Sequence, residues 1–345
     1  MRERKPLDQR LRSYLDELVE LVESDQSQPV TNQDRVRLAR ARINRALEKR
    51  ENIPGLPNDV EMRNVTIGSG IPGRIYLPSR SSRPVPTVIY LHGGGWVVGS
   101  IATHDPFCRL LCEQAGVAIV SVEYRLAPEH PFPAGLDDVF ESVVWAQRHI
   151  EQWNGDPGRL ALGGDSAGAN LAAVTANEMV AKKDLSRLAA LLLLYPVTDH
   201  PNSNHPSYTE NATGCGLEAS AMRWFWEQYA PSVAPGNPGI SPLQIQSVPP
   251  LPPTLITTAE YDVLRDEAIA YAGKLKAANV EVTHMHSPDM NHNFAVHPGT
   301  VARFPQSQTT LAAIAEWLRE TLMTGRRVGL RPAGCGGILP PVPIQ

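Results

Sequence analysis

One stretch near the middle of the chain, residues 160–171 (LALGGDSAGANL), constrains the fold more than any other part of the sequence. An apolar run ends at Gly163, the pentapeptide Gly164–Gly168 (GDSAG) follows, and a pattern of small residues typical of a helix begins at once. A strand that becomes a helix over so few residues needs a very tight turn, which holds Ser166 at strained backbone angles. Glycine on either side makes the turn feasible, because larger side chains there would collide with the strand and the helix. We therefore predict a strand–turn–helix unit with Ser166 at its tip.

Charge and hydropathy exclude several classes of protein. The chain has 345 residues, with 32 basic and 36 acidic side chains and a formal net charge of −4. No long run of one charge occurs, which makes nucleic acid an unexpected partner. The longest apolar run, Leu188 to Val197, is too short to span a bilayer, and the charged start of the chain lacks the apolar stretch of a signal peptide. We expect no stable membrane insertion and a cytoplasmic location.

The four cysteines agree with that location. Cys108 and Cys112 are four residues apart in an expected helix, without a second pair of ligands nearby. We interpret them as reduced core thiols rather than a metal site. Cys215 and Cys335 stand alone, so no disulfide framework is expected.

From about residue 60 onwards, apolar strands alternate with helices. We expect strands at Glu61–Ile67, Gly73–Leu77, Thr87–Leu91, Val117–Val122, Leu160–Gly163, Ala189–Tyr195, Thr254–Ala259 and Val280–Met285, and helices near 104–115, 137–151, 167–182, 265–278 and 307–323. Almost wholly apolar strands are typical of a parallel sheet covered on both faces. The pattern predicts an α/β fold with a mostly parallel eight-stranded sheet, in which functional residues follow the carboxyl ends of strands.

Three parts of the chain depart from this alternation. Residues 7–24 and a segment capped by Thr31 and Asn32 have helical periodicity and end near a Pro/Gly-rich boundary at 53–57. Residues 200–239 interrupt the strands and carry a group of large side chains, Met222, Trp224, Phe225, Trp226 and Tyr229. Their spacing fits either ordinary helix packing or a lid helix that faces a substrate. Residues 325–345 are rich in Gly and Pro and are expected to form a flexible tail.

A second glycine-rich motif, His92-Gly93-Gly94-Gly95, directly follows the expected strand at Thr87–Leu91. Three consecutive glycines favour neither a helix nor a strand, and they expose backbone N–H groups. Such amides, together with the amide of the residue after a nucleophilic serine, can stabilise a developing oxyanion. That residue is Ala167 here. The alternative is a flexible glycine loop. We expect the His92 side chain to brace this loop rather than act as a base.

An activated serine needs a general base. Six histidines follow Ser166: His200, His205, His284, His286, His292 and His297. The first two lie in the inserted segment, and the next two share one face of a strand, as packing or surface groups would. His292 lies in a loop beyond the end of a strand, which favours it as the base, with His297 as the close rival.

The base in turn needs an orienting acid. Asp262 is the first loop carboxylate after the strand Thr254–Ala259, which favours it. Asp266 and Glu267 are expected to open the next helix, where they would stabilise its N-terminus. We expect Glu260 and Asp165 to be structural partners of loop amides or arginines. Two arginines, Arg125 and Arg265, are candidates for buried ion pairs.

The order of these motifs resembles the hormone-sensitive-lipase-like (bacterial family IV) carboxylesterases of the α/β-hydrolase superfamily. The matching segments are HGGG at 92–95, YRLAPEHPFPA at 124–134, GDSAG at 164–168, YP at 195–196, WFW at 224–226, SPL at 241–243, AEYDVLRDE at 259–267 and the histidine of HNF at 292–294. The likeness covers roughly residues 7 to 323. It implies an α/β-hydrolase fold, a triad of Ser166, Asp262 and His292, and an oxyanion region formed by Gly93, Gly94, Gly95 and Ala167.

The resemblance also implies a domain organisation. Residues 1–52 and 200–239 would form a helical cap over a catalytic core of residues 53–199 and 240–324, with 325–345 as an appended tail. One position departs from the family, which has glycine where this chain has Asn293. Asparagine tolerates a positive φ angle better than most residues, so we expect the loop to keep its shape.

The resemblance implies hydrolysis of short- to medium-chain acyl esters through an acyl-enzyme, without a metal or an organic cofactor. The expected partner is a small-molecule ester. An amidase, a lactonase or a drug-ester hydrolase would use the same three residues. A non-catalytic receptor of the same fold is disfavoured, because relatives of that kind have lost the histidine. A homodimer is left open.

Overall fold

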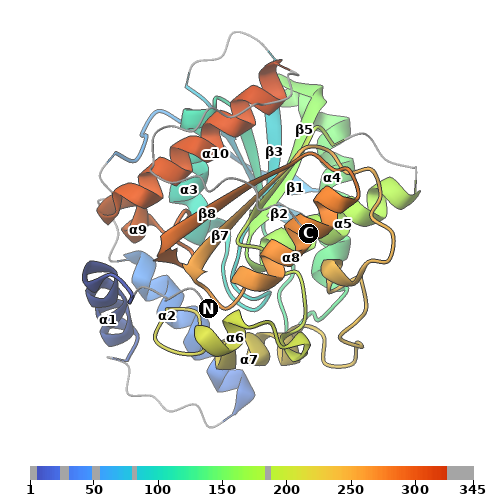
Figure 1. The fold of residues 1–345 in the computed structure, drawn as a ribbon. Helices are drawn as coiled ribbons and strands as arrows, with labels where there is room; N and C mark the ends of the chain where they lie inside the picture. The colour runs from blue at the N-terminus through green and yellow to red at the C-terminus, as the bar shows by residue number, and fades with distance from the viewer. Residues whose placement is uncertain (1–5, 24–30, 49–54, 80–83, 183–187, 325–345) are drawn as a thin grey trace, which may run out of the picture.

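The computed structural model describes residues 6–23, 31–48, 55–79, 84–182, 188–324, and Figure 1 shows their arrangement. The expected tail at 325–345, Cys335 and the first residues of the boundary at 53–57 lie outside these ranges. Cys108, Cys112 and Cys215 are buried, and no disulfide joins them to one another.

The centre of the molecule is an eight-stranded sheet with the order β1-β2-β4-β3-β5-β6-β7-β8. Its strands are β1 (Glu61–Ile67), β2 (Ile71–Leu77), β3 (Val85–Leu91), β4 (Ala118–Val122), β5 (Gly155–Asp165), β6 (Ala190–Leu194), β7 (Thr254–Tyr261) and β8 (Val282–Asn291). The β1–β2 and β2–β4 pairs are antiparallel, and all the other pairs are parallel. The predicted α/β fold with a mostly parallel eight-stranded sheet is confirmed.

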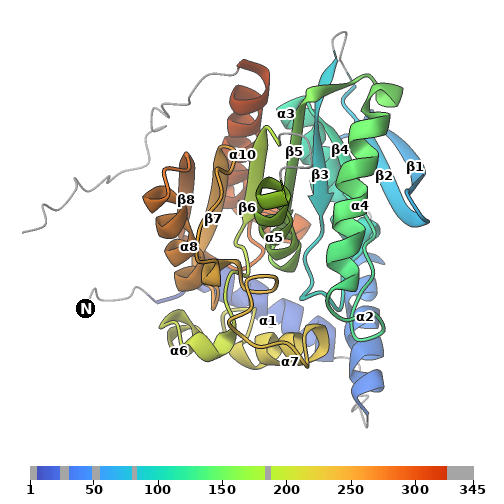
Figure 2. The same ribbon diagram turned by 90° about the vertical axis from the view of Figure 1, so that its right-hand side faces the viewer.

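Helices cover both faces of this sheet (Figures 1 and 2). The helices are α1 (Gln9–Glu23), α2 (Asn32–Glu48), α3 (Ile101–Ala115), α4 (Ala134–His149), α5 (Ala167–Lys182), α6 (Ser207–Glu210), α7 (Ala219–Tyr229), α8 (Arg265–Ala277), α9 (Pro298–Arg303) and α10 (Pro305–Thr324), with short 3₁₀ turns at Ile150–Trp153, Pro201–Ser203 and Pro242–Gln244. Helices α4, α5 and α8 share one apolar core with the sheet, while α3 and α10 share another.

Strand β3 illustrates why the internal strands are apolar throughout. Ile89 and Leu91 belong to the core under α4 and α5, whereas Val88 and Tyr90 belong to the core under α3 and α10. Successive side chains of a strand point to opposite faces, so both sets are buried when both faces are covered. The C-terminus of β3 delivers the glycine-rich loop to the carboxyl edge of the sheet.

At that edge, α1 and α2 lie beside α6 and α7 of the inserted segment (Figure 2). The indole Nε1 of Trp224 in α7 donates to Oδ1 of Asn32 at the start of α2 (3.0 Å). The Arg35 guanidinium lies over the Trp224 ring, 4.5 Å from its centroid. These contacts join the N-terminal helices to the inserted segment.

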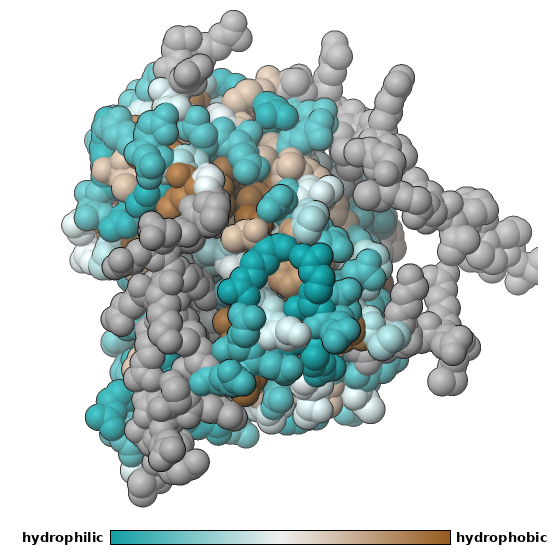
Figure 3. Space-filling view, turned by 90° about the vertical axis from the view of Figure 1, so that its left-hand side faces the viewer, coloured by the Kyte–Doolittle hydropathy of each residue, from teal (hydrophilic) through white to brown (hydrophobic). Residues whose placement is uncertain are grey.

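The described surface is mainly hydrophilic on the face shown in Figure 3, with small hydrophobic areas between polar side chains. The exposed large apolar side chains, Val19, Met62, Ile269 and Met323, lie on four different elements. Among the helices that the structure describes, none has both the length and the apolar character needed to cross a bilayer.

Candidate active site

The turn between β5 and α5 places Ser166 at the carboxyl edge of the sheet. Its φ angle is +54°, in the left-handed region that L residues rarely adopt, and its amide donates to the Leu194 carbonyl (2.9 Å). A Cβ atom at Gly164 or Gly168 would overlap the Leu91 carbonyl oxygen. The structure thus has the predicted strained backbone at Ser166, and the space on either side of it admits only glycine.

The glycine-rich loop after β3 lies next to this turn. Gly94 and Gly95 have φ angles of +120° and +56°, and a Cβ atom at Gly94 would overlap the Val98 carbonyl. Within the described ranges, the amides of Gly94, Gly95 and Ala167 form no hydrogen bond to the protein. All three amides are therefore available to a bound group.

Gly93, by contrast, has its amide already engaged. This N–H donates to Oδ1 of Asp165 (3.0 Å), which also accepts from the Tyr90 hydroxyl (2.7 Å). His104 Nε2 lies 3.2 Å from the same oxygen. Burial alone would raise the pKa of Asp165, but His104 and the Tyr90 hydroxyl outweigh it and hold that pKa below its ordinary value. Gly93 thus anchors the loop and differs from its two glycine neighbours, with which the sequence grouped it.

The His92 side chain braces the same loop. Its Nδ1 lies 2.9 Å from the Gly93 carbonyl, and its ring stacks on Tyr124 at a centroid distance of 4.3 Å. Complete burial, together with the nearby His104, lowers the pKa of His92 to about 3. The ring is consequently neutral near pH 7, so Nδ1 carries the proton and donates to the carbonyl.

Three side chains from three different strand ends form one hydrogen-bonded chain. The Ser166 hydroxyl lies 3.1 Å from His292 Nε2, and His292 Nδ1 lies 2.8 Å from Asp262 Oδ2. Asp262 follows β7 and His292 follows β8, which continues to Asn291 rather than ending near residue 285 as expected. The other carboxylate oxygen, Oδ1 of Asp262, accepts from the Leu264 amide (2.9 Å).

Two further features fix the imidazole. The Tyr195 ring packs edge-on against His292, with ring centroids 4.8 Å apart. Asn293, the residue after the histidine, has a φ angle of +67°. The position therefore requires the left-handed conformation, and asparagine adopts it as expected.

The remaining candidate bases and acids are engaged elsewhere. His284 and His286 lie 2.8 and 3.0 Å from the Thr258 hydroxyl, on one side of β8. His297 Nδ1 is 2.8 Å from the Tyr14 hydroxyl. Glu260 forms an ion pair with Arg265 (2.8 Å). None of these groups contacts Ser166 in the described structure.

Helix α7 covers the glycine-rich loop. The ring of Tyr229 stacks on Trp96 at 4.2 Å, and Trp226 meets the same indole edge-on at 4.9 Å. A Cβ atom at Gly95 would overlap the Phe225 ring. Trp226 and Tyr229 thus pack in the core, as ordinary helix packing predicts, while Phe225 borders the loop.

The sequence reading did not single out some of the residues that shape this site. Arg40 of α2 donates to the carbonyls of Val97 (2.9 Å) and Ala127 (3.1 Å), and so fastens the N-terminal helices to the glycine-rich loop. His104 and Tyr90 complete the cluster around Asp165. The available signal was a polar side chain inside the apolar strand at 87–91, which Thr87 shares with Tyr90.

Comparisons with known proteins place the chain in a family. A family model described as alpha/beta hydrolase fold matches residues 88–296. "Carboxylesterase NlhH" of Mycobacterium tuberculosis is 38% identical over 278 residues, which are 76% of this chain and 83% of that protein. "Ethyl acetate hydrolase" of Pseudomonas putida is 37% identical over 230 residues, covering 66% of this chain and 72% of that protein. The chain belongs to the α/β-hydrolase fold family, and its resemblance to the hormone-sensitive-lipase-like carboxylesterases is confirmed.

Solved structures agree with this assignment. A thermostable esterase from Pseudomonas putida ECU1011 has a TM-score of 0.82 and 30% identity, covering 93% of this chain and 99% of that one. An ester hydrolase from the metagenome of Lake Arreo, solved with a bipyridine phosphonate derivative, has a TM-score of 0.82 and 32% identity, covering 93% of this chain and 100% of that one.

Proposed function

We propose that this chain is a serine carboxylesterase that hydrolyses short- to medium-chain acyl esters through a Ser166–His292–Asp262 triad. The hydrogen-bonded chain from the Ser166 hydroxyl through both ring nitrogens of His292 to the Asp262 carboxylate carries the proposal. The esterase relatives support ester hydrolysis as the reaction class.

The reaction begins when His292 Nε2 takes the hydroxyl proton and the Ser166 oxygen attacks the ester carbonyl. Asp262 keeps the proton of the resting imidazole on Nδ1 and stabilises the imidazolium that forms. The imidazolium then protonates the departing alcohol, which leaves Ser166 acylated. Water repeats the sequence on the acyl-enzyme, releases the carboxylic acid and restores the serine.

The amides of Gly94, Gly95 and Ala167 are assigned to the developing oxyanion, because all three are unbonded and border the serine turn. Gly93 has a supporting task, since its amide holds the loop on Asp165. Removal of one oxyanion donor in an enzyme of this kind typically lowers kcat by about 10²–10³-fold.

A helical cap formed by residues 1–52 and 200–239 is also part of the proposal. The bond between Trp224 and Asn32 joins these two segments, and α7 covers the glycine-rich loop. Ser166 and His292 are each only 5% exposed, which supports a cap over the site. The Phe225 ring lies against Gly95 and limits the space next to the proposed oxyanion amides, which supports the preference for short acyl chains.

The proposal is tested with p-nitrophenyl esters of increasing acyl length. Wild type should hydrolyse short and medium chains and lose activity on long ones. Ser166→Ala should retain the fold by circular dichroism and lose nearly all activity. Hydrolysis by Ser166→Ala at the wild-type rate would end the proposal, and a preference for long chains would end the substrate assignment.

A further inference from the structure

The turn that carries Asp262 departs from the regular sheet. The pairing of β7 with β8 is irregular between Ala259 and Tyr261, and Tyr261 pairs with Asn291 directly before His292. The carbonyls of Glu260 and Asp262, the residues on either side of Tyr261, therefore accept from donors outside the sheet. Arg265 supplies some of them, since its Nη1 donates to the Glu260 carbonyl (3.3 Å) and its amide to the Asp262 carbonyl (3.2 Å). A buried carbonyl without a donor costs about 1–3 kcal/mol.

Asn211, in the inserted segment, serves both carbonyls. Its Nδ2 donates to the Asp262 carbonyl (2.8 Å) and to the Glu260 carbonyl (3.1 Å), and the residue is completely buried. A primary amide nitrogen carries two hydrogens, so one nitrogen satisfies both acceptors. The Oδ1 atom faces the Cys215 thiol (3.8 Å), which agrees with the nitrogen facing the carbonyls.

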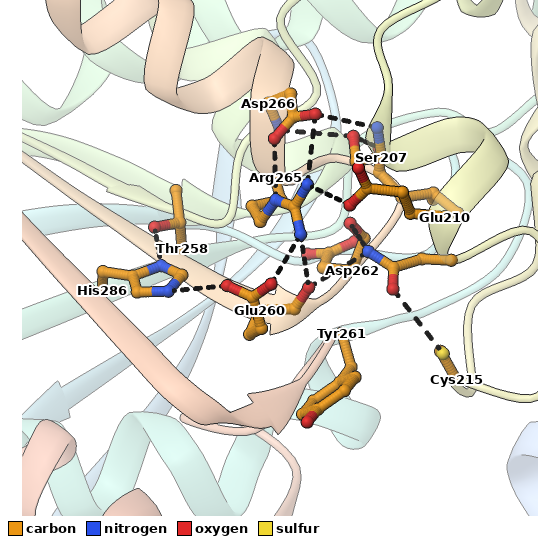
Figure 4. A network of polar contacts seen from close by, with 12 residues as sticks. Ser207, Glu210, Cys215, Thr258, Glu260, Tyr261, Asp262, Arg265, Asp266 and His286 are labelled. Carbon is orange, nitrogen blue, oxygen red and sulfur yellow. Dashed lines mark hydrogen bonds and ion pairs between the residues drawn. The ribbon is translucent and has the colours of Figure 1, made fainter. Parts of the chain in front are cut away.

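Short polar contacts hold the segment before Asn211 against the same turn (Figure 4). The Ser207 amide donates to Oδ2 of Asp266 (2.8 Å). Arg265, with a side chain only 10% exposed, forms ion pairs with Glu210 of the inserted segment (2.6 Å) and with Glu260 (2.8 Å). Arg265 is largely buried while its carboxylate partners are partly exposed, so loss of these partners would leave a buried cation unpaired. Helix α6 and the turn are consequently fixed to each other.

We propose that Asn211 is a positioning residue that sets the direction of the Asp262 carboxylate toward His292. The inference rests on the proposed function, in which that carboxylate orients the base. Asn211 restrains the Glu260–Tyr261 and Asp262–Val263 peptide planes, and the second of these is attached directly to the Asp262 Cα that carries the carboxylate side chain. The inserted segment thereby acts on the acid of the triad as well as covering the serine.

The test uses Asn211→Asp, which keeps the shape of the side chain and replaces the donor by an oxygen. Asn202→Asp is the matched control, since Asn202 is an exposed asparagine of the same segment. Active sites are counted by titration with a fluorophosphonate, so that kcat is expressed per competent site. The low-field Nδ1 proton resonance of His292, assigned by its loss in His292→Ala, reports the bond to Asp262 without any substrate.

We expect kcat per site to fall roughly 10- to 100-fold in Asn211→Asp, as for a displaced catalytic group, with KM within about twofold of wild type. The Nδ1 proton resonance should shift or disappear, and Asn202→Asp should match wild type in both measurements. If Asn211→Asp does not fold, Asn211→Ser, which retains one donor, should show a smaller loss of kcat in the same direction.

Two results would overturn the inference. One is a wild-type kcat per site with an unchanged proton resonance in the Asn211 variant. The other is a smaller number of competent sites that each work at the wild-type rate, which would mean that Asn211 only stabilises the fold. A wild type without ester hydrolysis would refute the proposed function instead, and the resonance would still test the contact between Asn211 and the turn.

Discussion

The amide of Gly93 donates to the carboxylate of Asp165, the residue directly before Ser166 in the sequence. The bond ties the loop after β3 to the turn after β5, so the amides assigned to the oxyanion and the serine hydroxyl keep a fixed relative position. Because Tyr90 and His104 contact the same carboxylate oxygen, the connection continues into the core beneath α3.

Replacement of Asp165 by alanine should reduce both stability and activity. The Gly93 amide and the Tyr90 hydroxyl would lose their buried acceptor, which we expect to cost about 2–5 kcal/mol of unfolding free energy. The loop would lose its anchor, so kcat should fall far more than KM rises. Urea unfolding and steady-state kinetics measure the two effects. Tyr90→Phe, which removes one donor and leaves the anchor intact, is the control and should keep nearly all activity.

Gly164 and Gly168, the glycines on either side of Ser166, should tolerate no side chain. In Gly168→Ala the new Cβ would overlap the carbonyl oxygen of Leu91, so we expect a severe loss of stability or activity. Gly273→Ala in α8 is the matched control, because its Cβ would meet nothing within 4 Å. That change should stabilise the protein by about 0.5–1 kcal/mol, since alanine is the better helix former. Equal thermal stability of the two variants would contradict the geometry of the turn.

Asn293 should accept glycine but not a β-branched residue. Glycine adopts the left-handed conformation at no steric cost, so Asn293→Gly should keep wild-type kcat within about threefold. Asn293→Val forces a strained backbone that costs roughly 1–3 kcal/mol and displaces the adjacent His292, so kcat should fall. Thermal melting and ester kinetics on both variants check this. Full activity in the valine variant would show that the φ angle at this position does not matter.

The buried ring of His92 should make the protein less stable in mild acid. Its pKa is about 3 in the folded protein, against about 6.5 in an unfolded chain, so between these values the unfolded state binds the extra proton. Above about pH 6.5 neither state binds this proton, and His92 does not lower the free energy of unfolding. As the pH drops from about 6.5 toward 3, the free energy of unfolding falls by up to about 1.4 kcal/mol per pH unit. Urea unfolding from pH 7 to 4.5 should show a shallower decline in His92→Gln. If the free energy of unfolding declined equally with pH in wild type and His92→Gln, protonation of His92 in the unfolded state would not be the cause.

Local patterns predicted the fold well because the internal parallel strands are apolar and most of them are followed by a recognisable helix. Ser166, Asp262 and His292 could be selected because each follows a strand end, and parallel strands deliver their carboxyl ends to one edge. The continuation of β8 to Asn291 was not predicted, since the polar run after Met285 resembles a loop.

Local sequence patterns did not predict contacts between segments that are far apart in the chain. Nothing in the sequence near Gly93 indicates that its amide is bonded to Asp165, so the three glycines were treated as equivalent. Asn211 similarly lies in a polar run, where asparagine is ordinarily a turn residue. Only the packing of the inserted segment against the turn at 260–266 gives it two buried carbonyl partners.

In the proposed mechanism, Ser166 is the nucleophile and His292 activates it. Incubation of wild type, Ser166→Ala and His292→Ala with a small fluorophosphonate, followed by measurement of intact mass and of the labelled peptide, tests these two roles. We expect one adduct per wild-type chain, located on Ser166, with loss of esterase activity in proportion to labelling. We expect no adduct in Ser166→Ala and much slower labelling in His292→Ala. Inactivation of wild type with the label on another residue, or equal labelling of Ser166→Ala, would contradict these roles.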